Sequence, residues 1–288
     1  MTIEAKVVKE LRERTGVGMM DCKKALLETD GDLDKAVEFL RKAGQAKADK
    51  KSSRIAAEGI IVLKELDDLY AIIEVNSETD FVAKDQNFTH FSDLVVQLIL
   101  EHQPKNIEDL MKIEVNGSSL EEIRKELVSK VGENISVRRF SLLRTKNMVS
   151  QYSHMGRIGV MVEIKGDNQT IANDISMQIA ASDPQYIDID DIPEVELNKE
   201  REILVAQALQ EGKSEDIVEK MVDGRLRKHL SEITLVGQSF IKDTDITVGS
   251  LLSSSSIEVI SFIRYELGEG ITKKQEDFVA EVMAQASQ

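Results

Sequence analysis

Apolar positions near the start of the chain recur at helical spacing and predict three short helices. The first runs over about 3–14, and the second includes 19–27. The third begins at the capping residue Asp32 and is expected to end at Gly44. Because helices of this length are marginal when isolated, all three should pack together into one small bundle.

From residue 59 onward the pattern changes to alternation, which is typical of strands. Segments 59–64 and 69–75 predict a β-hairpin that turns at Asp67 and Asp68. A helix over 88–100 follows, and then a helical segment over 107–131 that is interrupted near 116–118. Residues 135–143 return as a strand.

The same succession then recurs along the chain. Segments 148–153 and 158–164 read as strands, and Asp167 is expected to open the next helix. A strand over 258–266 comes last. Because the match lies in the pattern and not in residue identity, we interpret it as a diverged internal duplication of a small antiparallel sheet backed by helices.

A pair of helices with a narrow apolar seam and many charges is predicted between these parts, and it is typical of an antiparallel coiled coil. The sequence therefore predicts an α+β fold with a ubiquitin-associated-like N-terminal module, a duplicated core and a projecting helical hairpin. The expected divisions are a three-helix module at 1–45, a basic linker at 46–58, core subdomain N at 59–144, core subdomain C at 145–190 and 231–270, the hairpin at 191–230, and a C-terminal module at 271–288.

The turn between the predicted strand 69–75 and the helix after it is rich in acceptors and acids around one aromatic side chain, Phe81. In one interpretation Thr79 or Asp80 caps the helix and Phe81 folds back as its hydrophobic staple. In the other, Phe81 inserts into a partner while Asp80 places a negative charge beside it. The run by itself leaves both interpretations open.

Charge and cysteine content narrow the class of protein. The chain of 288 residues has 37 Lys and Arg against 52 Asp and Glu, a net charge of −15, which disfavours direct binding to nucleic acid. Its single cysteine, Cys22, permits no internal disulfide, as expected in a reducing cytoplasm. We recognise no signal peptide and no apolar run near the ~20 residues that span a membrane, so we expect a cytoplasmic protein without membrane attachment.

The sequence contains no convincing catalytic constellation. It has no Walker-type phosphate loop, and its four histidines lack metal-ligand spacing. Glu74, Glu78 and Asp80 could hold a magnesium ion, which keeps a magnesium-dependent enzyme as one alternative. An adaptor that works through residues 2–44 alone is another. The preferred interpretation is an interaction protein with no catalytic residue, metal or cofactor.

Several runs resemble the signatures of the bacterial elongation factor Ts family. Residues 12–26 (RERTGVGMMDCKKAL) are similar to its N-terminal signature, and residues 74–84 (EVNSETDFVAK) to its second signature. Residues 131–134, 154–160 and 262–270 also fit, so the resemblance covers essentially the whole chain. It implies a guanine nucleotide exchange factor that promotes GDP release from elongation factor Tu during translation elongation.

The resemblance also implies which residues meet that GTPase. Asp80 and Phe81 would intrude beside its magnesium site and switch helix, and the tail after Gly270 would help to grip it. A dimer of heterodimers through the core or the hairpin is possible. The implied contact residues are Thr79, Asp80, Phe81 and Val82 in the turn, Arg12, Met19 and Met20 in the N-terminal module, and Val131, Gly132 and His154 in the core.

Overall fold

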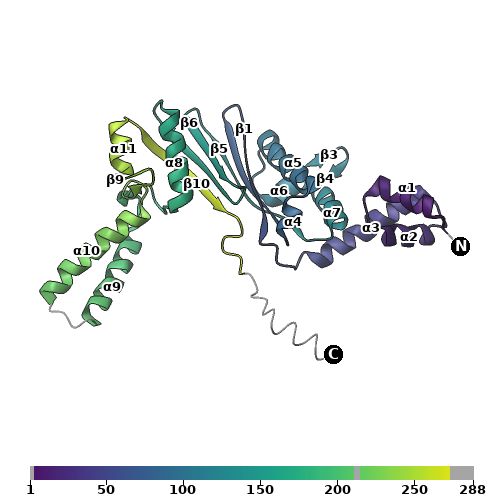
Figure 1. The fold of residues 1–288 in the computed structure, drawn as a ribbon, viewed down its shortest axis with the longest axis horizontal. Helices are drawn as coiled ribbons and strands as arrows, with labels where there is room; N and C mark the ends of the chain where they lie inside the picture. The colour runs from purple at the N-terminus through teal and green to yellow at the C-terminus, as the bar shows by residue number, and fades with distance from the viewer. Residues whose placement is uncertain (1–2, 211–214, 273–288) are drawn as a thin grey trace. The chain divides into compact units, whose positions relative to one another are not determined.

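The fold was obtained as a computed structural model that describes residues 3–210 and 215–272 (Figure 1). Its described residues form two compact units. The first comprises residues 3–64, 73–142 and 266–272, and the second comprises the described residues of Glu65–Ile72 and Leu143–Tyr265. Most of the predicted C-terminal module at 271–288 lies outside the described residues, and the domain boundaries stay a prediction.

The N-terminal module consists of three helices, as the apolar periodicity predicts. They are α1 (Ala5–Thr15), α2 (Met19–Glu28) and α3 (Leu33–Lys51). Gly16 ends α1 in the left-handed conformation, and Asp32 caps α3 by accepting from the N–H groups of Asp34 and Lys35. One cluster of buried side chains joins the helices: Val8, Leu11, Cys22, Ala25, Leu26, Ala36 and Leu40.

The predicted end of the third helix at Gly44 is wrong, because α3 continues to Lys51. Gly44 is buried, and a Cβ atom there would lie 2.9 Å from Ser129 Oγ on another helix. The glycine thus permits a close approach of two helices instead of a left-handed cap. As a result, the first part of the predicted basic linker is the last turn of α3.

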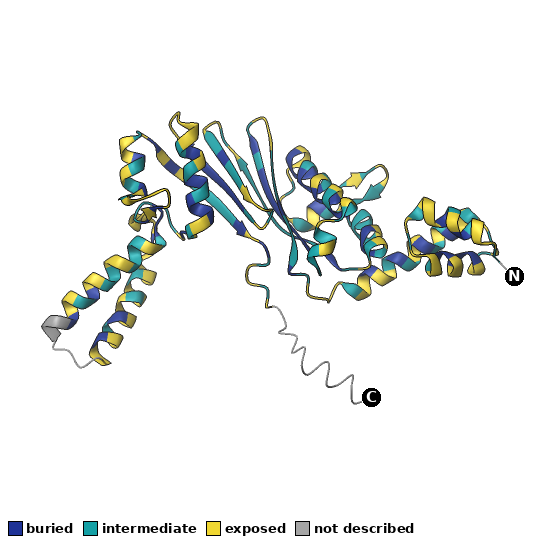
Figure 2. Cartoon of the chain, in the orientation of Figure 1, coloured by how far each residue is buried: buried dark blue, intermediate teal, exposed yellow. Residues whose placement is uncertain are grey.

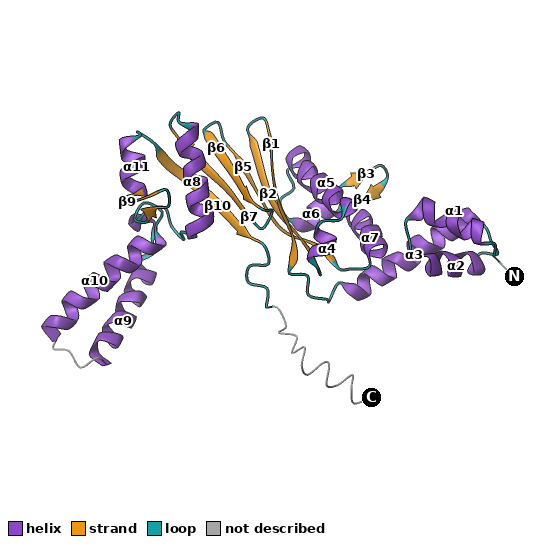
Figure 3. Cartoon of the chain, in the orientation of Figure 1, coloured by secondary structure: helices purple, strands orange, loops and turns teal. Residues whose placement is uncertain are grey.

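The first three-stranded sheet has the order β1-β2-β5. The strands β1 (Glu58–Leu66) and β2 (Leu69–Ser77) form the predicted hairpin, and Asp67 takes the positive φ of 54° that such a two-residue turn needs. The returning strand is β5 (Ile135–Arg144). Between them come α4 (Asp80–Ala83), α5 (Gln86–His102), α6 (Ile107–Met111), the small hairpin β3 (Glu114–Val115) and β4 (Ser118–Ser119), and α7 (Leu120–Val131) (Figure 3).

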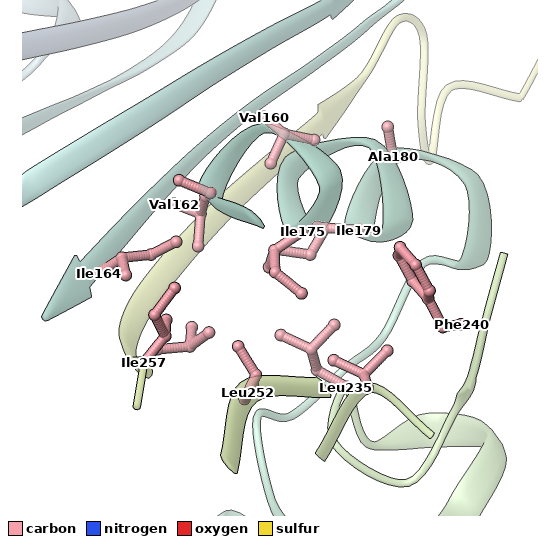
Figure 4. Packing of buried hydrophobic residues seen from close by; sticks show 13 residues of the cluster. Val160, Val162, Ile164, Ile175, Ile179, Ala180, Leu235, Phe240, Leu252 and Ile257 are labelled. Carbon is pink, nitrogen blue, oxygen red and sulfur yellow. The ribbon is translucent and has the colours of Figure 1, made fainter. Parts of the chain in front are cut away.

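The second sheet has the order β10-β7-β6 and belongs to the second unit. β6 (Met148–His154) and β7 (Ile158–Lys165) pair antiparallel, and β10 (Glu258–Glu266) lies on the other side of β7. One face of α8 (Gln169–Ser182) packs on β7 around Val162 and Ile175 (Figure 4). The remaining elements are the 3-10 turn η1 (Ile189–Asp191), α9 (Glu194–Gln210), α10 (Glu215–Ile233), β8 (Ser239–Phe240), β9 (Asp243–Thr247) and α11 (Val248–Ser254).

The two sheets share one topology, which confirms the duplication that the pattern predicts. In each, the second hairpin strand lies in the middle and the returning strand pairs with its free edge. The middle strands also match in register: Glu74 of β2 corresponds to Glu163 of β7, and the cap Thr79 corresponds to Asn168. Asn168, and not the predicted Asp167, caps α8, because its side chain accepts from the N–H of Ile171.

The helices α9 and α10 pack against each other, as the predicted hairpin requires. Their apolar seam is lined by Leu204, Ala208, Val218 and Val222, and Figure 2 shows exposed residues along the other faces of both helices. The connection at 211–214 is outside the described residues. None of the helices in the described ranges is long and apolar enough to cross a membrane.

Candidate functional site

Phe81 is exposed on the short helix α4, which contains no buried residue. Thr79 caps α4, as one interpretation of the sequence holds, but the predicted hydrophobic staple is wrong because Phe81 is 81% exposed. No residue of α4 is buried. The corresponding position of the second half is Thr170. An aromatic residue is therefore not needed to begin a helix at this point of the fold.

Two hydrogen bonds from Thr79 to Glu133 hold the turn in place. The Thr79 N–H donates to Glu133 Oε2 at 2.9 Å, and the Thr79 hydroxyl donates to Oε1 at 2.7 Å. The same hydroxyl oxygen accepts from the N–H of Val82 at 3.4 Å, so it links the carboxylate to the first turn of α4. Glu133 follows Gly132, whose left-handed conformation ends α7 and turns the chain toward β5.

Another hydrogen bond joins the same two segments, with the donor on the other one. The N–H of Asn134 donates to Glu78 Oε1 at 2.6 Å. The Asn134 amide in turn donates to the carbonyl of Arg54 at 2.8 Å, and Lys51 donates to the carbonyl of Gly132. Burial lowers the pKa of Lys51, and the neighbouring charge of Arg54 adds to this effect. The segments 51–54, 77–81 and 131–134 are thus tied into one polar cluster.

Asp80 lies beside Phe81 and pairs with a lysine of the same turn. Lys84 Nζ is 2.7 Å from Asp80 Oδ2, and both side chains are largely exposed. Exposed pairs one helical turn apart stabilise a helix by only about 0.3–0.5 kcal/mol. The pair with Lys84 therefore contributes little to the stability of α4.

The three carboxylates of the magnesium-enzyme alternative do not converge. Glu74 is fully buried and accepts from Arg138, Arg139 and the N–H of Gly268. Burial alone would raise the pKa of Glu74, but these hydrogen bonds together hold it below the usual range. Across the described residues, no group of three or more acidic, histidine or cysteine side chains could hold a metal ion.

The contact residues expected in the N-terminal module lie at its surface. Arg12 is exposed on α1. At the start of α2, Met19 is 45% exposed and Met20 is 76% exposed, so neither methionine fills the core of the module. Exposed methionine side chains are adaptable apolar contacts. Cys22 on the same helix is buried within the module.

The core contact residues fall in both units. Gly132 is exposed and Val131 is partly buried at the end of α7, next to the polar cluster around Thr79. His154 belongs to the second unit, where it ends β6 at the surface and its Nδ1 lies 3.2 Å from the Tyr152 hydroxyl. The neighbouring Met155 is 86% exposed and has a positive φ of 53°.

The sequence prediction misses Glu133, Asn134 and Glu78 as parts of the site. Each is polar and lies next to a predicted contact residue, but its role depends on a bond to a segment more than fifty positions away. No local pattern reports such a pairing. The only signal is that Gly132 turns the chain directly before two side chains able to bond a backbone.

Comparison with known proteins agrees with this architecture. The family model described as Elongation factor TS matches residues 78–269, which is more than half of the chain. A protein named Elongation factor Ts from Alkalilimnicola ehrlichii is 56% identical over 99% of each chain, and one from Thioalkalivibrio sulfidiphilus is 54% identical over 99% of each. A protein named Elongation factor Ts from Legionella pneumophila is 50% identical over 99% of this chain and 98% of its own. The chain belongs to the elongation factor Ts family.

Proposed function

We propose that this protein is a guanine nucleotide exchange factor that promotes GDP release from elongation factor Tu during translation elongation. The observation that carries the proposal is the exposed Phe81 on a helix that buries nothing. Burying a large apolar side chain is favourable, so the exposure of Phe81 next to the carboxylate of Asp80 supports a role in binding a partner. Family membership supplies the identity of the partner.

Exchange of this kind requires differential binding and no covalent chemistry. The factor must bind the GTPase more tightly without GDP than with it, and linkage then loosens GDP by the same factor. A ten-thousandfold loosening corresponds to roughly 5.5 kcal/mol of coupling. Burial of Phe81 would contribute about 1.5–3 kcal/mol. The rest must come from a broad interface.

Asp80 would act beside Phe81 on the magnesium site of the GTPase. A bound divalent cation is the largest charge in such a site, so a carboxylate brought next to it changes the coordination of the nucleotide phosphates. Asp80 is half-exposed and precedes Phe81 directly in the sequence, which supports this role. Thr79 and Val82 would shape the same contact, since they flank the two inserted residues.

The other expected contacts extend the interface. Exposed Arg12, Met19 and Met20 suit a surface that meets the nucleotide-binding domain. Val131, Gly132 and His154 would add contacts from the core. We expect no direct contact with nucleic acid, and pairing of two factor–GTPase complexes through the core or the hairpin stays a prediction.

The test is the rate of GDP release from purified elongation factor Tu. The rate should rise when the full chain is added, and Phe81→Ala or Asp80→Ala should slow the stimulated release without unfolding the factor. The circular dichroism and urea unfolding of each variant serve as the control for folding. An unchanged release rate with the intact chain would refute the proposal.

A further inference from the structure

The turn that carries Phe81 needs an anchor that the hydrophobic core does not supply. Polar bonds fix α4, and none of its residues is fully buried. The strand β2 is buried as far as Ser77 and the next buried residue is Phe88 on α5, so the core holds the chain on either side of the turn and not within it. Short exposed helices open locally at low free energy, and the orientation of Phe81 therefore depends on what restrains residue 79.

We propose that Glu133 is a positioning residue that holds the Phe81 turn in the conformation that meets a partner. Both of its carboxylate oxygens are used, one by the Thr79 N–H and the other by the Thr79 hydroxyl. Because the hydroxyl proton points to Glu133, the oxygen lone pairs are directed to the N–H of Val82. The Glu133 carboxylate thus fixes the orientation of the Thr79 hydroxyl as well as the position of Thr79.

A carboxylate accepts from both Thr79 donors at once, whereas the amide of Gln has one acceptor and one donor. In Glu133→Gln the NH2 group would face either the Thr79 N–H or the Thr79 hydroxyl, which would then have to accept and turn its proton away. Hydrogen bonds to charged groups are also stronger than neutral ones. The substitution therefore weakens the restraint while the side chain keeps its size.

The capping box of α7 offers a matched control in the same unit. Glu122 accepts from the N–H of Ser119 at 3.0 Å and from its hydroxyl at 3.3 Å, the same pair of donor types that Glu133 receives from Thr79. It differs in holding the start of a helix that buries Leu120, Leu127 and Val128. Glu122→Gln should leave the Phe81 turn unchanged.

Amide hydrogen exchange of the isolated protein tests the positioning directly. In Glu133→Gln, exchange of the amides over 79–84 should speed up about tenfold or more relative to the wild type. In Glu122→Gln these amides should exchange as in the wild type. The urea midpoint of Glu133→Gln should stay close to that of the wild type, because no residue of α4 is fully buried. Unchanged exchange over 79–84 in Glu133→Gln would overturn the inference.

A second measurement connects the restraint to function, and here the inference rests on the proposed exchange activity. At saturating concentrations of the factor, Glu133→Gln should lower the stimulated GDP release rate about tenfold, while Glu122→Gln should leave it unchanged. Thr79→Val combined with Glu133→Gln should cost less than the sum of the two single variants, because both disrupt the bond between the Thr79 hydroxyl and Glu133. A fully active Glu133→Gln with a loosened turn would contradict the link to partner contact.

The two measurements separate the possible failures. If the wild-type chain does not stimulate GDP release, the proposed function is wrong, and the exchange of amides 79–84 still decides whether Glu133 holds the turn. If release is stimulated but the turn of Glu133→Gln exchanges normally, the function stands and the positioning role is wrong.

Discussion

The two strand-to-helix turns of the duplicated core begin alike and are held in different ways. Each follows a buried glutamate on the middle strand, Glu74 or Glu163, and each starts at a capping residue five positions later. In the second half the helix α8 places Ala172 and Ile175 in the core within its first turns. In the first half α4 buries nothing and depends on polar bonds from another loop.

The buried glutamates also differ in their partners. Glu74 accepts from Arg138 and Arg139 on β5, whereas Glu163 accepts from the neutral donors Thr145, Asn147 and Ser261. The difference follows from the returning strands, where Val-Arg-Arg-Phe at 137–140 corresponds to Val-Ile-Ser-Phe at 259–262.

This comparison shows how one of two similar turns in a duplicated fold can present a residue to a partner. The second half keeps its helix start by the burial of Ala172 and Ile175, and it exposes the small polar Thr170 where the first half has Phe81. The first half gives up that burial at α4 and gains an exposed aromatic residue on a short helix whose position is set by a few directional bonds. Such a turn can present Phe81 without the rest of the sheet having to change.

The largest effect is expected where the comparison predicts hydrophobic anchoring. Ile175→Ala should lower the free energy of unfolding by about 2–5 kcal/mol, because the side chain is fully buried against β7. Val82→Ala, at a partly buried position of α4, should cost less than about 1 kcal/mol. Urea unfolding of both variants checks the difference. Equal losses would mean that α4 is anchored in a core after all.

The next effect concerns the two buried glutamates. Glu74→Gln removes the carboxylate that Arg138 and Arg139 share, although Arg139 keeps its pair with Glu269, and breaking a fully buried pair costs about 3–5 kcal/mol. Because Arg138 and Arg139 are each more than a quarter exposed, we expect about 2–3 kcal/mol here. Glu163→Gln loses bonds to neutral donors only and should cost about 1–2 kcal/mol. Denaturant midpoints that rank the two variants in the reverse order would contradict this comparison.

Low pH should destabilise the protein through the same two glutamates, Glu74 and Glu163. Burial opposes ionisation of Glu74, but its hydrogen bonds leave the pKa lowered from 4.5, and the bond from Thr145 does most to lower the pKa of Glu163. A carboxyl with a lowered folded pKa stabilises the protein above its unfolded pKa and loses that contribution as the pH falls through the folded value. Stability should therefore decline below about pH 4.5, and Glu74→Gln should flatten part of this decline in urea titrations at stepped pH.

The smallest effect on stability is expected at the turns themselves. A substitution there should change the exchange activity while leaving the free energy of unfolding nearly the same. Phe81→Thr makes the first turn resemble the second and should change the free energy of unfolding by no more than about 0.5 kcal/mol, since the ring is mostly exposed. It should slow stimulated GDP release roughly tenfold to a hundredfold, which is the loss of one buried aromatic contact. Thr170→Phe is the control and should leave release unchanged. A large loss of stability in Phe81→Thr would restore a structural role for the ring.

Much of the fold follows from local patterns in the sequence. The three N-terminal helices, both hairpins and the returning strands are predicted from apolar spacing and turn residues, and the structure confirms them. Predictions fail where a residue has more than one use. Gly44 resembles a helix end but permits close packing on Ser129, and Asp167 resembles a cap although its neighbour Asn168 makes the bond.

The sequence by itself determined the order of elements, the duplicated pattern and the presence of an acid beside an aromatic residue after the middle strand. Those depend on spacing, which is local. Only the tertiary structure decided that Phe81 points to solvent, that Glu74 is neutralised by arginines of β5, and that Glu133 restrains Thr79. Each of these depends on groups far apart in the chain, and the free energy of a buried charge or a directional hydrogen bond is fixed by the partner that folding brings to it.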